Sequence, residues 1–116
     1  MRHIIYNTDW HEETERRVAK GTAFFRQGYN CSQSVALAFA DYYGVPEELM
    51  ARISSSFGGG IGRMREVCGA ASGMFMLAGL EISDGKPDRE TKAKVYEAVQ
   101  KLAERYRSVT GTIVCR

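Results

Sequence analysis

Three cysteines are the residues of this chain most able to do chemistry, and they stand at positions 31, 68 and 115 of a 116-residue sequence. An odd number with no close pair excludes a fully paired disulfide framework, and also the short-spaced thioredoxin and zinc-ribbon patterns. Thiolates attack disulfides and bind soft metals, whereas a protonated cysteine packs like a small hydrophobic residue. The cysteines therefore allow dithiol–disulfide exchange, a metal or iron–sulfur site, or ordinary packing.

Two of the cysteines fall at predicted helix starts. Cys31 directly follows Asn30, which acts as a helix cap, and Cys68 falls about two residues inside a helix that begins near Glu66. Free backbone N–H groups and the helix dipole favour a thiolate at such positions. We therefore expect Cys68 to be the attacking thiolate and Cys31 or Cys115 to be its resolving partner.

A glycine-rich loop, residues 57–63, lies just before Cys68. It is neither a Walker loop nor a dinucleotide fingerprint, because the following residues and the glycine spacing are wrong for both. The loop could offer backbone N–H groups to an anion or cofactor, or its glycines could allow positive φ angles and close passage beside a helix. We expect it to form a polar wall beside Cys68 from Gly58, Gly59, Gly60, Gly62 and Arg63.

The other polar candidates carry less signal. His3 and His11 lie far from the cysteines in sequence, and we expect both on the surface. Asp41, Glu66 and Glu81 suit helix ends or solvated positions. No combination of serine, cysteine, histidine and aspartate has the local signature of a nucleophilic hydrolase.

Composition fits one soluble domain. The chain is 44% hydrophobic with a net charge of +2, so it can bury a core and has no strong attraction for nucleic acid. Its most apolar stretch, residues 67–82, is short and weakly hydrophobic for a membrane span. The N-terminus turns polar by Asn7, which leaves no room for a secretory signal. We expect a cytoplasmic protein with no membrane insertion.

The positioning elements read as helices throughout. Cap and periodicity signals predict helices over residues 9–28, 30–44, 46–56, 66–80 and 88–109, after a leader of residues 1–8. No segment alternates like a strand. We predict an all-α fold in which residues 1–116 form a single compact bundle of about five helices, with the glycine-rich loop before a buried fourth helix.

The last two predicted helices have distinct faces. The fourth is apolar nearly all round, and Gly69 and Gly73 give it a small face that permits close approach of a neighbour. The fifth carries a regular apolar seam that ends before Gly111; its members are Val95, Val99, Leu102, Tyr106 and Val109.

Four motifs together are similar to the C_GCAxxG_C_C family of redox-active proteins. They are Asn30-Cys31-Ser32-Gln33, the loop of residues 57–63, Cys68-Gly69-Ala70-Ala71-Ser72-Gly73 and Ile113-Val114-Cys115-Arg116. The resemblance covers roughly residues 14–116 and implies that Cys31, Cys68 and Cys115 match three of the family's cysteines. A further family cysteine would fall beyond Arg116.

Three functional hypotheses follow from these observations. The leading one is a thiol-based redox protein, which would be a thiol–disulfide oxidoreductase with a redox partner that the sequence does not identify. The second is a zinc or iron–sulfur module, which needs a ligand beyond the three cysteines. The third is a non-catalytic helical protein, such as a homodimer, whose cysteines only pack.

Overall fold

The computed structural model describes residues 10–115, and it is an all-α bundle as predicted. Among these residues there is no strand, only one antiparallel bridge between Val67 and Val114. The helices are α1 (Trp10–Arg26), α2 (Cys31–Leu37), α3 (Glu47–Ser54), the short 3₁₀ turn η1 (Ser55–Phe57), α4 (Gly69–Ile82) and α5 (Arg89–Thr110).

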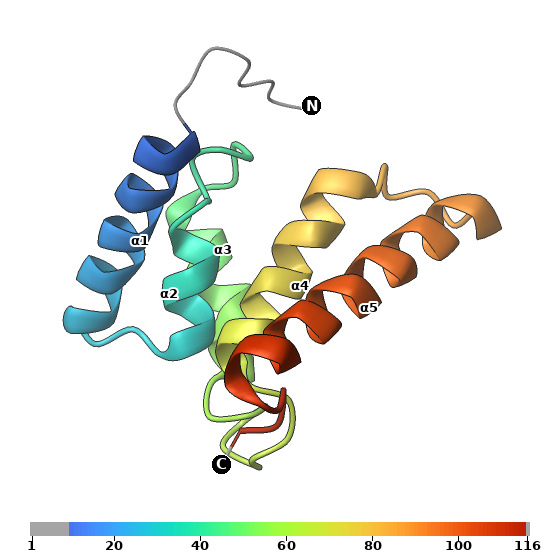
Figure 1. Cartoon of the computed structure of the whole chain (residues 1–116). Helices are drawn as coiled ribbons and strands as arrows, with labels where there is room; N and C mark the ends of the chain where they lie inside the picture. Colours follow the sequence, from blue (N-terminus) through green and yellow to red (C-terminus); the bar gives the residue numbers. More distant parts are fainter. Residues whose placement is uncertain (1–9, 116) are drawn as a thin grey trace.

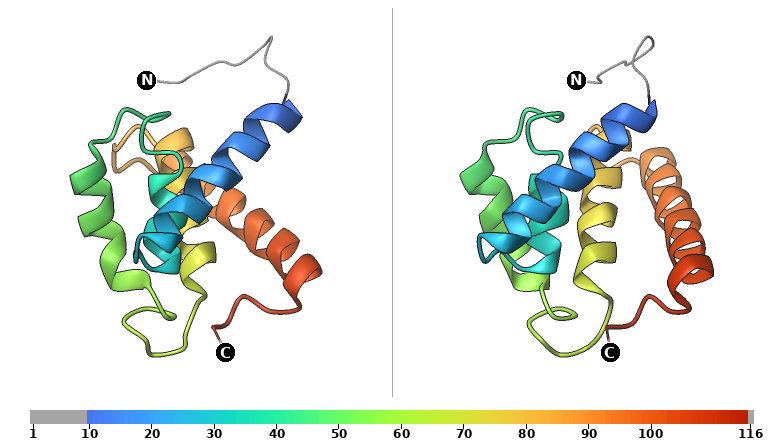
Figure 2. Two further views of the ribbon diagram at one scale, coloured as in Figure 1. Left: turned by 90° about the vertical axis from the view of Figure 1, so that its left-hand side faces the viewer. Right: turned by 60° about the vertical axis from the view of Figure 1, so that its left-hand side comes forward.

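Helix α2 lies at the centre of the bundle. It packs against α1, α3 and α4, and α5 packs against the other side of α4 (Figure 1). A cluster of buried side chains from α2, the turn after it, α3 and α4 forms the core; it consists of Ala36, Leu37, Ala40, Met50 and Leu77. The short connections place α1 beside α2 and α4 beside α5; the helices of each pair run in opposite directions and cross at an angle (Figure 2).

Local signals set most helix ends. Asn30 and Gln33 form the reciprocal capping box at the start of α2, with both hydrogen bonds present. Asp88 accepts a hydrogen bond from the Thr91 N–H to start α5, and Gly111 ends α5 in the left-handed conformation, at φ 90°. The cap predicted at Asp9 lies outside the described residues.

Helix α2 is shorter than the predicted 30–44. It ends at Leu37, and the backbone continues to Gly44 through turns. Arg17 of α1 explains part of this difference, because its guanidinium donates to the Ala38 carbonyl at 2.8 Å and holds the chain where the helix stops. A tertiary contact of this kind leaves no trace in local sequence.

Arg17 is the most buried charged residue among those described, at 7% exposure. It pairs with Glu13 at 2.8 Å and with Asp41 at 2.6 Å, and Lys20 also donates to Asp41. Burial raises the pKa of Asp41, but hydrogen bonds from Lys20 and Arg17 outweigh burial and lower that pKa to about 2. The charge cluster thus fastens α1 to the end of α2.

Asp41→Asn should lower the free energy of unfolding at pH 7 by about 1 kcal/mol, a value discounted because the Asp41 side chain is 58% exposed. Since the folded pKa is depressed, the wild-type advantage is complete above pH 4 and fades as the pH falls towards 2. Urea unfolding at several pH values measures it. Glu97→Gln, which breaks only an exposed pair with Lys101, serves as the control and should change stability little. An advantage that persists at pH 2 would contradict this assignment.

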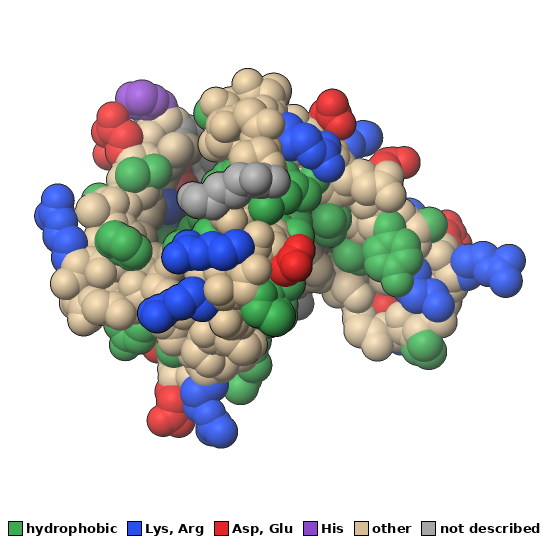
Figure 3. All heavy atoms as spheres, turned by 90° about the horizontal axis from the view of Figure 1, so that it is seen from below, with side chains coloured by type: hydrophobic (Ala, Val, Ile, Leu, Met, Phe, Trp, Pro, Cys, Tyr) green, Lys and Arg blue, Asp and Glu red, His purple; other side chains and the backbone are tan. Residues whose placement is uncertain are grey.

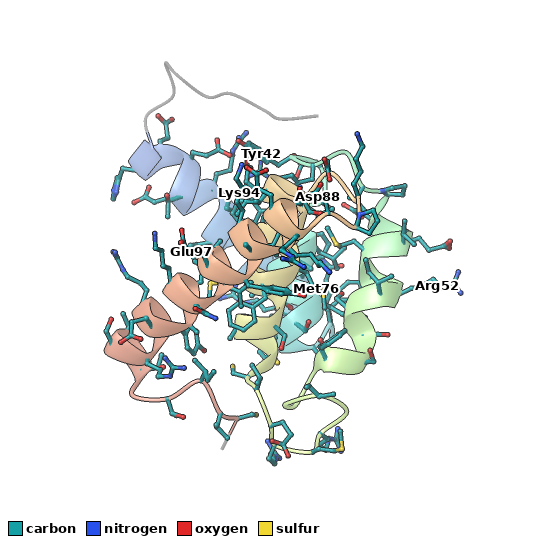
Figure 4. The ribbon with its side chains drawn as sticks, turned by 90° about the vertical axis from the view of Figure 1, so that its right-hand side faces the viewer. Tyr42, Arg52, Met76, Asp88, Lys94 and Glu97 are labelled. Atoms are coloured by element: carbon teal, nitrogen blue, oxygen red, sulfur yellow. The ribbon has the colours of Figure 1, made fainter. Side chains whose placement is uncertain are left out.

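Helix α4 approaches α2 through its small face, as predicted. A Cβ atom at Gly73 would stand 3.0 Å from both the Ser32 carbonyl and the Val35 Cβ. The helix is not enclosed on every side, because Leu80 is 42% exposed and Met76 lies in the opening between α3 and α5, while Arg52 projects from the outer side of α3 (Figure 4).

None of the helices in residues 10–115 combines the length and the apolar character that a membrane crossing requires.

Candidate functional site

One end of the bundle collects the starts of α2 and α4, the end of α5, the glycine-rich loop and the C-terminal segment (Figure 1). All three cysteines belong to these segments, and each is half-buried and unbonded to another sulfur. Helices that begin or end at the same level thus bring together residues far apart in sequence.

Cys68 is the N-cap of α4 and does not lie inside the first turn, because the helix starts at Gly69 and not near Glu66. Its backbone N–H donates to the Ile113 carbonyl at 2.6 Å, which ties this helix start to the C-terminal segment. The position still faces the free N–H groups of the first turn of α4.

The thiol of Cys68 contacts the hydroxyl of Tyr106 on α5, with 3.2 Å between sulfur and oxygen. Burial raises the pKa of Cys68, but the Tyr106 hydrogen bond and the backbone N–H groups of Ala71 and Ala70 outweigh burial, so the pKa falls below its ordinary value. Neither N–H forms a full capping hydrogen bond to the sulfur. A reactive cysteine needs this kind of environment, since the thiolate is the nucleophile.

The pKa of Tyr106 also depends on the other two thiols. Its pKa is raised to about 12, first by the hydrogen bond to Cys68, then by burial, and then by the charges of Cys68, Cys31 and Cys115. The hydroxyl therefore lies within electrostatic reach of all three sulfurs.

Tyr106→Phe should raise the pKa of Cys68, because it removes a donor that favours the thiolate. The rate of iodoacetamide reaction with Cys68 at pH 7 should fall by up to about tenfold, and its pH profile should move to higher pH. Mass spectrometry of Cys68 peptides against time and pH measures this. Tyr96→Phe, on the same helix at a side chain that is 60% exposed, should leave the profile unchanged. An unmoved Cys68 profile in Tyr106→Phe would rule out the hydroxyl as its donor.

Cys31 is the first residue of α2, as predicted, and its sulfur lies against Gly69. A Cβ atom on residue 69 would overlap that sulfur and would also stand 3.0 Å from the Phe57 carbonyl. Because Gly69 follows Cys68 directly, the missing side chain lets the Cys31 sulfur approach the start of α4. The small face predicted for helix packing thus has a second consequence at the cysteines.

Cys115 reaches the site through the bridge between Val67 and Val114. Its N–H donates to the Glu66 carbonyl at 2.6 Å, and its sulfur accepts from Arg65 at 3.7 Å. The bridge places Cys68 opposite Ile113 and Cys115 opposite Glu66, so the two cysteines do not face each other directly across it.

The glycine-rich loop holds these segments in place. Gly59, Gly60 and Gly62 have positive φ, and a Cβ on Gly60 would stand 2.7 Å from the Cys115 Cβ. Gly58 passes so close to Asn30 that a side chain on it would overlap the cap. These glycines thus have the positive φ angles and the close passage that the structural interpretation describes. Figure 3 views the molecule from this end, where basic and hydrophobic side chains share the surface.

Three residues without glycine's freedom also have positive φ in the loop or just after it: Ile61, Arg63 and Arg65. Such a conformation costs about 1–2 kcal/mol for a residue with a Cβ atom. Arg63 is exposed, and the basic side chain that contacts a cysteine sulfur is that of Arg65.

Arg63→Gly should be more stable than Arg63→Ala by about 1 kcal/mol, because only glycine relieves the strain at φ 64°. The two variants remove the same charge, so their difference isolates the backbone effect. Urea unfolding of both proteins gives the difference. Equal stabilities would mean that residue 63 is not held in this conformation.

The remaining candidates do not join the cysteines. His11 lies on the surface and pairs with Glu15 at 3.1 Å, whereas His3 lies outside the described residues. Asp41 pairs with Arg17, and Glu81 accepts from Tyr43. Within residues 10–115, no group of three or more histidine, cysteine, aspartate or glutamate side chains has an arrangement suited to a metal ion.

Tyr106 is the site residue that sequence reasoning missed, because its place in the apolar seam of α5 suggested packing alone. The order of α4 and α5 along the chain could have indicated this role of Tyr106. Helix α4 ends at Ile82 and α5 starts at Arg89, so α5 returns along α4 in the opposite direction. Its last turns therefore lie at the level of Cys68, where α4 begins. A hydroxyl at that level could have been expected to face the thiol.

Comparison with protein-family models matches residues 29–116 to the family described as "Putative redox-active protein (C_GCAxxG_C_C)". The match includes all three cysteines, the glycine-rich loop and Tyr106. Comparison with curated proteins and with solved structures finds no match.

Proposed function

The chain belongs to the C_GCAxxG_C_C family, and from this premise we propose that Cys31 and Cys68 form a two-electron dithiol–disulfide couple. The observation that carries the proposal is the Cys68 thiol at the start of α4, hydrogen-bonded to Tyr106 and separated from the Cys31 sulfur by a residue with no side chain. A stabilised thiolate and a neighbouring thiol are the two parts that disulfide exchange needs.

The exchange proceeds through a mixed disulfide. The Cys31 thiolate first attacks one sulfur of a substrate disulfide; the bond from Cys31 to the substrate forms as the substrate S–S bond breaks, and one substrate thiolate leaves. The Cys68 thiolate then attacks the Cys31 sulfur; the bond between the two protein sulfurs forms as the bond to the substrate breaks, and the second substrate thiolate leaves. The target of Cys68 is thus the mixed disulfide and not the substrate, which differs from the order expected from the sequence. In the reverse direction a substrate thiolate attacks Cys31, and the electron pair of the broken bond stays on Cys68, where Tyr106 stabilises it.

Cys31 is a better partner for Cys68 than Cys115 is. The Cys115 sulfur lies beside Arg65, in a segment fixed by two backbone hydrogen bonds across the bridge. Within this bridge Cys68 lies opposite Ile113 and not opposite Cys115. The Cys31 sulfur lies against Gly69, the residue that follows Cys68, and is not held by the bridge.

Equilibration in glutathione redox buffers tests the couple. Protein reduced without oxygen is equilibrated, its free thiols are alkylated, and the mass is read. Two alkylation sites should disappear together at one midpoint, in the wild type and in Cys115→Ser alike. Three free thiols at every buffer ratio would overturn the proposal, as would stoichiometric zinc or iron in the reduced protein.

A further inference from the structure

An apolar groove lies between α1 and the pair formed by α2 and α4, and we call it the α1 groove. Its volume is about 600 Å³, within the range of small-molecule pockets. Its walls include Val18 and Phe25 of α1, Val35 of α2, Phe39 of the turn after α2, and Ala70 and Met74 of α4. Figure 2 shows α1 crossing in front of α2 and α4 on this side.

The α1 groove leaves apolar side chains of α1 exposed to solvent. Val18 is 62% exposed and Phe25 is 60% exposed, although both belong to the one apolar face of α1. Removing such side chains from water favours binding of an apolar ligand.

Cys31 also forms part of the wall of the α1 groove. The neighbouring wall residue from α4 is Ala70, which follows Gly69, the residue that the Cys31 sulfur touches. A ligand in the groove can therefore place an atom beside Cys31 while its apolar part covers Val18 and Phe25. The groove leads to the sulfur that the proposed couple uses to exchange with substrate.

The charges in the wall limit what the ligand can be. The charged side chains that line the α1 groove are Glu13 and Arg17, and they pair with each other at 2.8 Å. Arg17 is further bound by Asp41, so its charge is already compensated. The wall thus offers no free charge to an ionised group, which favours an uncharged apolar ligand.

We propose that the α1 groove binds the apolar part of a low-molecular-weight thiol, or of its disulfide, with the ligand sulfur at Cys31. This inference rests on the proposed couple. One ligand thiolate attacks Cys31 in the oxidised protein, forming a mixed disulfide and releasing the Cys68 thiolate. A second ligand thiolate then attacks the ligand sulfur of that mixed disulfide, which releases the ligand disulfide and the Cys31 thiolate. Two electrons pass from two ligand thiolates to the protein disulfide.

The test uses the reduced 116-residue chain in which Cys31 is the only cysteine, through Cys68→Ser and Cys115→Ser. Rates of reaction with octyl methanethiosulfonate and with the anionic sulfonatoethyl methanethiosulfonate are measured, and their ratio is compared with the ratio for glutathione. The protein ratio should exceed the glutathione ratio by about tenfold or more. Equal ratios would overturn the proposal.

A matched pair of variants locates the effect. Val18→Gln, which puts an uncharged polar group into the α1 groove, should lower the ratio towards that of glutathione without repelling the anionic reagent. Val109→Gln, the same change at a residue of α5 that is 79% exposed and outside the groove, should leave the preference intact. A preference that Val18→Gln does not reduce would contradict binding in the groove.

Two other occupants would give distinct results. If Cys31 reacts with the octyl reagent only when the substitutions I4E and I5E are both present, the N-terminal segment covers the α1 groove. If Cys31 reacts only after a dimer is diluted to monomers, a second copy of the chain covers the groove. Either result overturns the proposal. The assay uses reduced protein with one cysteine, so its result does not depend on whether a Cys31–Cys68 disulfide forms. Failure of the wild type to form that disulfide would be detected by the equilibration in glutathione buffers.

Discussion

Cys68→Ser is expected to abolish the two-electron couple. After equilibration in oxidising glutathione buffer, the variant should form no intramolecular disulfide, and its remaining thiols should be free or bonded to glutathione. The fastest phase of iodoacetamide reaction in the reduced protein should also vanish, because a serine hydroxyl does not ionise near neutral pH. Both effects amount to complete loss, whereas Tyr106→Phe should only slow the reaction.

The physical reason is that the environment of Cys68 favours the thiolate. The Tyr106 hydroxyl at 3.2 Å and the first N–H groups of α4 lower its pKa against the effect of burial. Cys115→Ser is the control, since it removes a thiol outside the couple and should keep both the midpoint and the fast phase. A disulfide between Cys31 and Cys115 that forms in Cys68→Ser at the wild-type midpoint would contradict these roles.

Gly69→Ala is expected to destabilise the protein by about 2–3 kcal/mol, because the new methyl group has no space. It would overlap the Cys31 sulfur and stand 3.0 Å from the Phe57 carbonyl. Gly79→Ala is the matched control in the same helix, since nothing lies within 4 Å of a Cβ there. The control should be neutral or more stable by up to about 1 kcal/mol, as expected when alanine replaces glycine inside a helix.

A double-mutant cycle separates the two causes of this destabilisation, the overlap with the Cys31 sulfur and the contact with the Phe57 carbonyl. Combining Gly69→Ala with Cys31→Ala should recover about 1–2 kcal/mol of the loss, because the overlapping sulfur is then gone. The rest should remain, since the Phe57 carbonyl still crowds the site. Urea unfolding of the four proteins gives the coupling. Strict additivity would show that the Cys31 sulfur does not lie against residue 69.

The helices and their caps could be predicted because their signals are local. Asn30 with Gln33, Asp88 and Gly111 each determine a helix end through hydrogen bonds or φ angles within a few residues. The small face formed by Gly69 and Gly73 likewise predicted the close approach of α4 to a neighbour. These features depend on spacing that a sequence displays directly.

The missed features all depend on partners distant in sequence. Helix α2 stops at Leu37, where the guanidinium of Arg17 donates a hydrogen bond to the carbonyl of Ala38, 21 residues later in the sequence. Cys68 becomes a cap because its N–H is held by Ile113. Tyr106 faces Cys68 only through the register of α4 and α5. The exposure of Val18 and Phe25 also had no local signal, since an apolar face on a helix does not reveal whether another element covers it.

For the glycine-rich loop, the sequence predicted the backbone conformation of the glycines but not that of the residues between them. Its composition predicted positive φ and close passage, and Gly60 beside Cys115 shows both. The same conformation at Ile61, Arg63 and Arg65 was not predicted, because residues with a Cβ atom rarely adopt it. The bonds that close the loop, such as that from the Gly62 N–H to the Ser56 carbonyl at 2.7 Å, hold them there.

Disulfide mapping of the oxidised wild-type protein tests the proposed couple most directly. The protein is equilibrated in glutathione buffer at a ratio that oxidises the couple, free thiols are blocked at low pH, and proteolytic peptides are identified by mass without reduction. We predict one linked pair of peptides carrying Cys31 and Cys68, with Cys115 blocked as a free thiol. A link that contains Cys115, or three blocked cysteines and no link, would contradict the central claim.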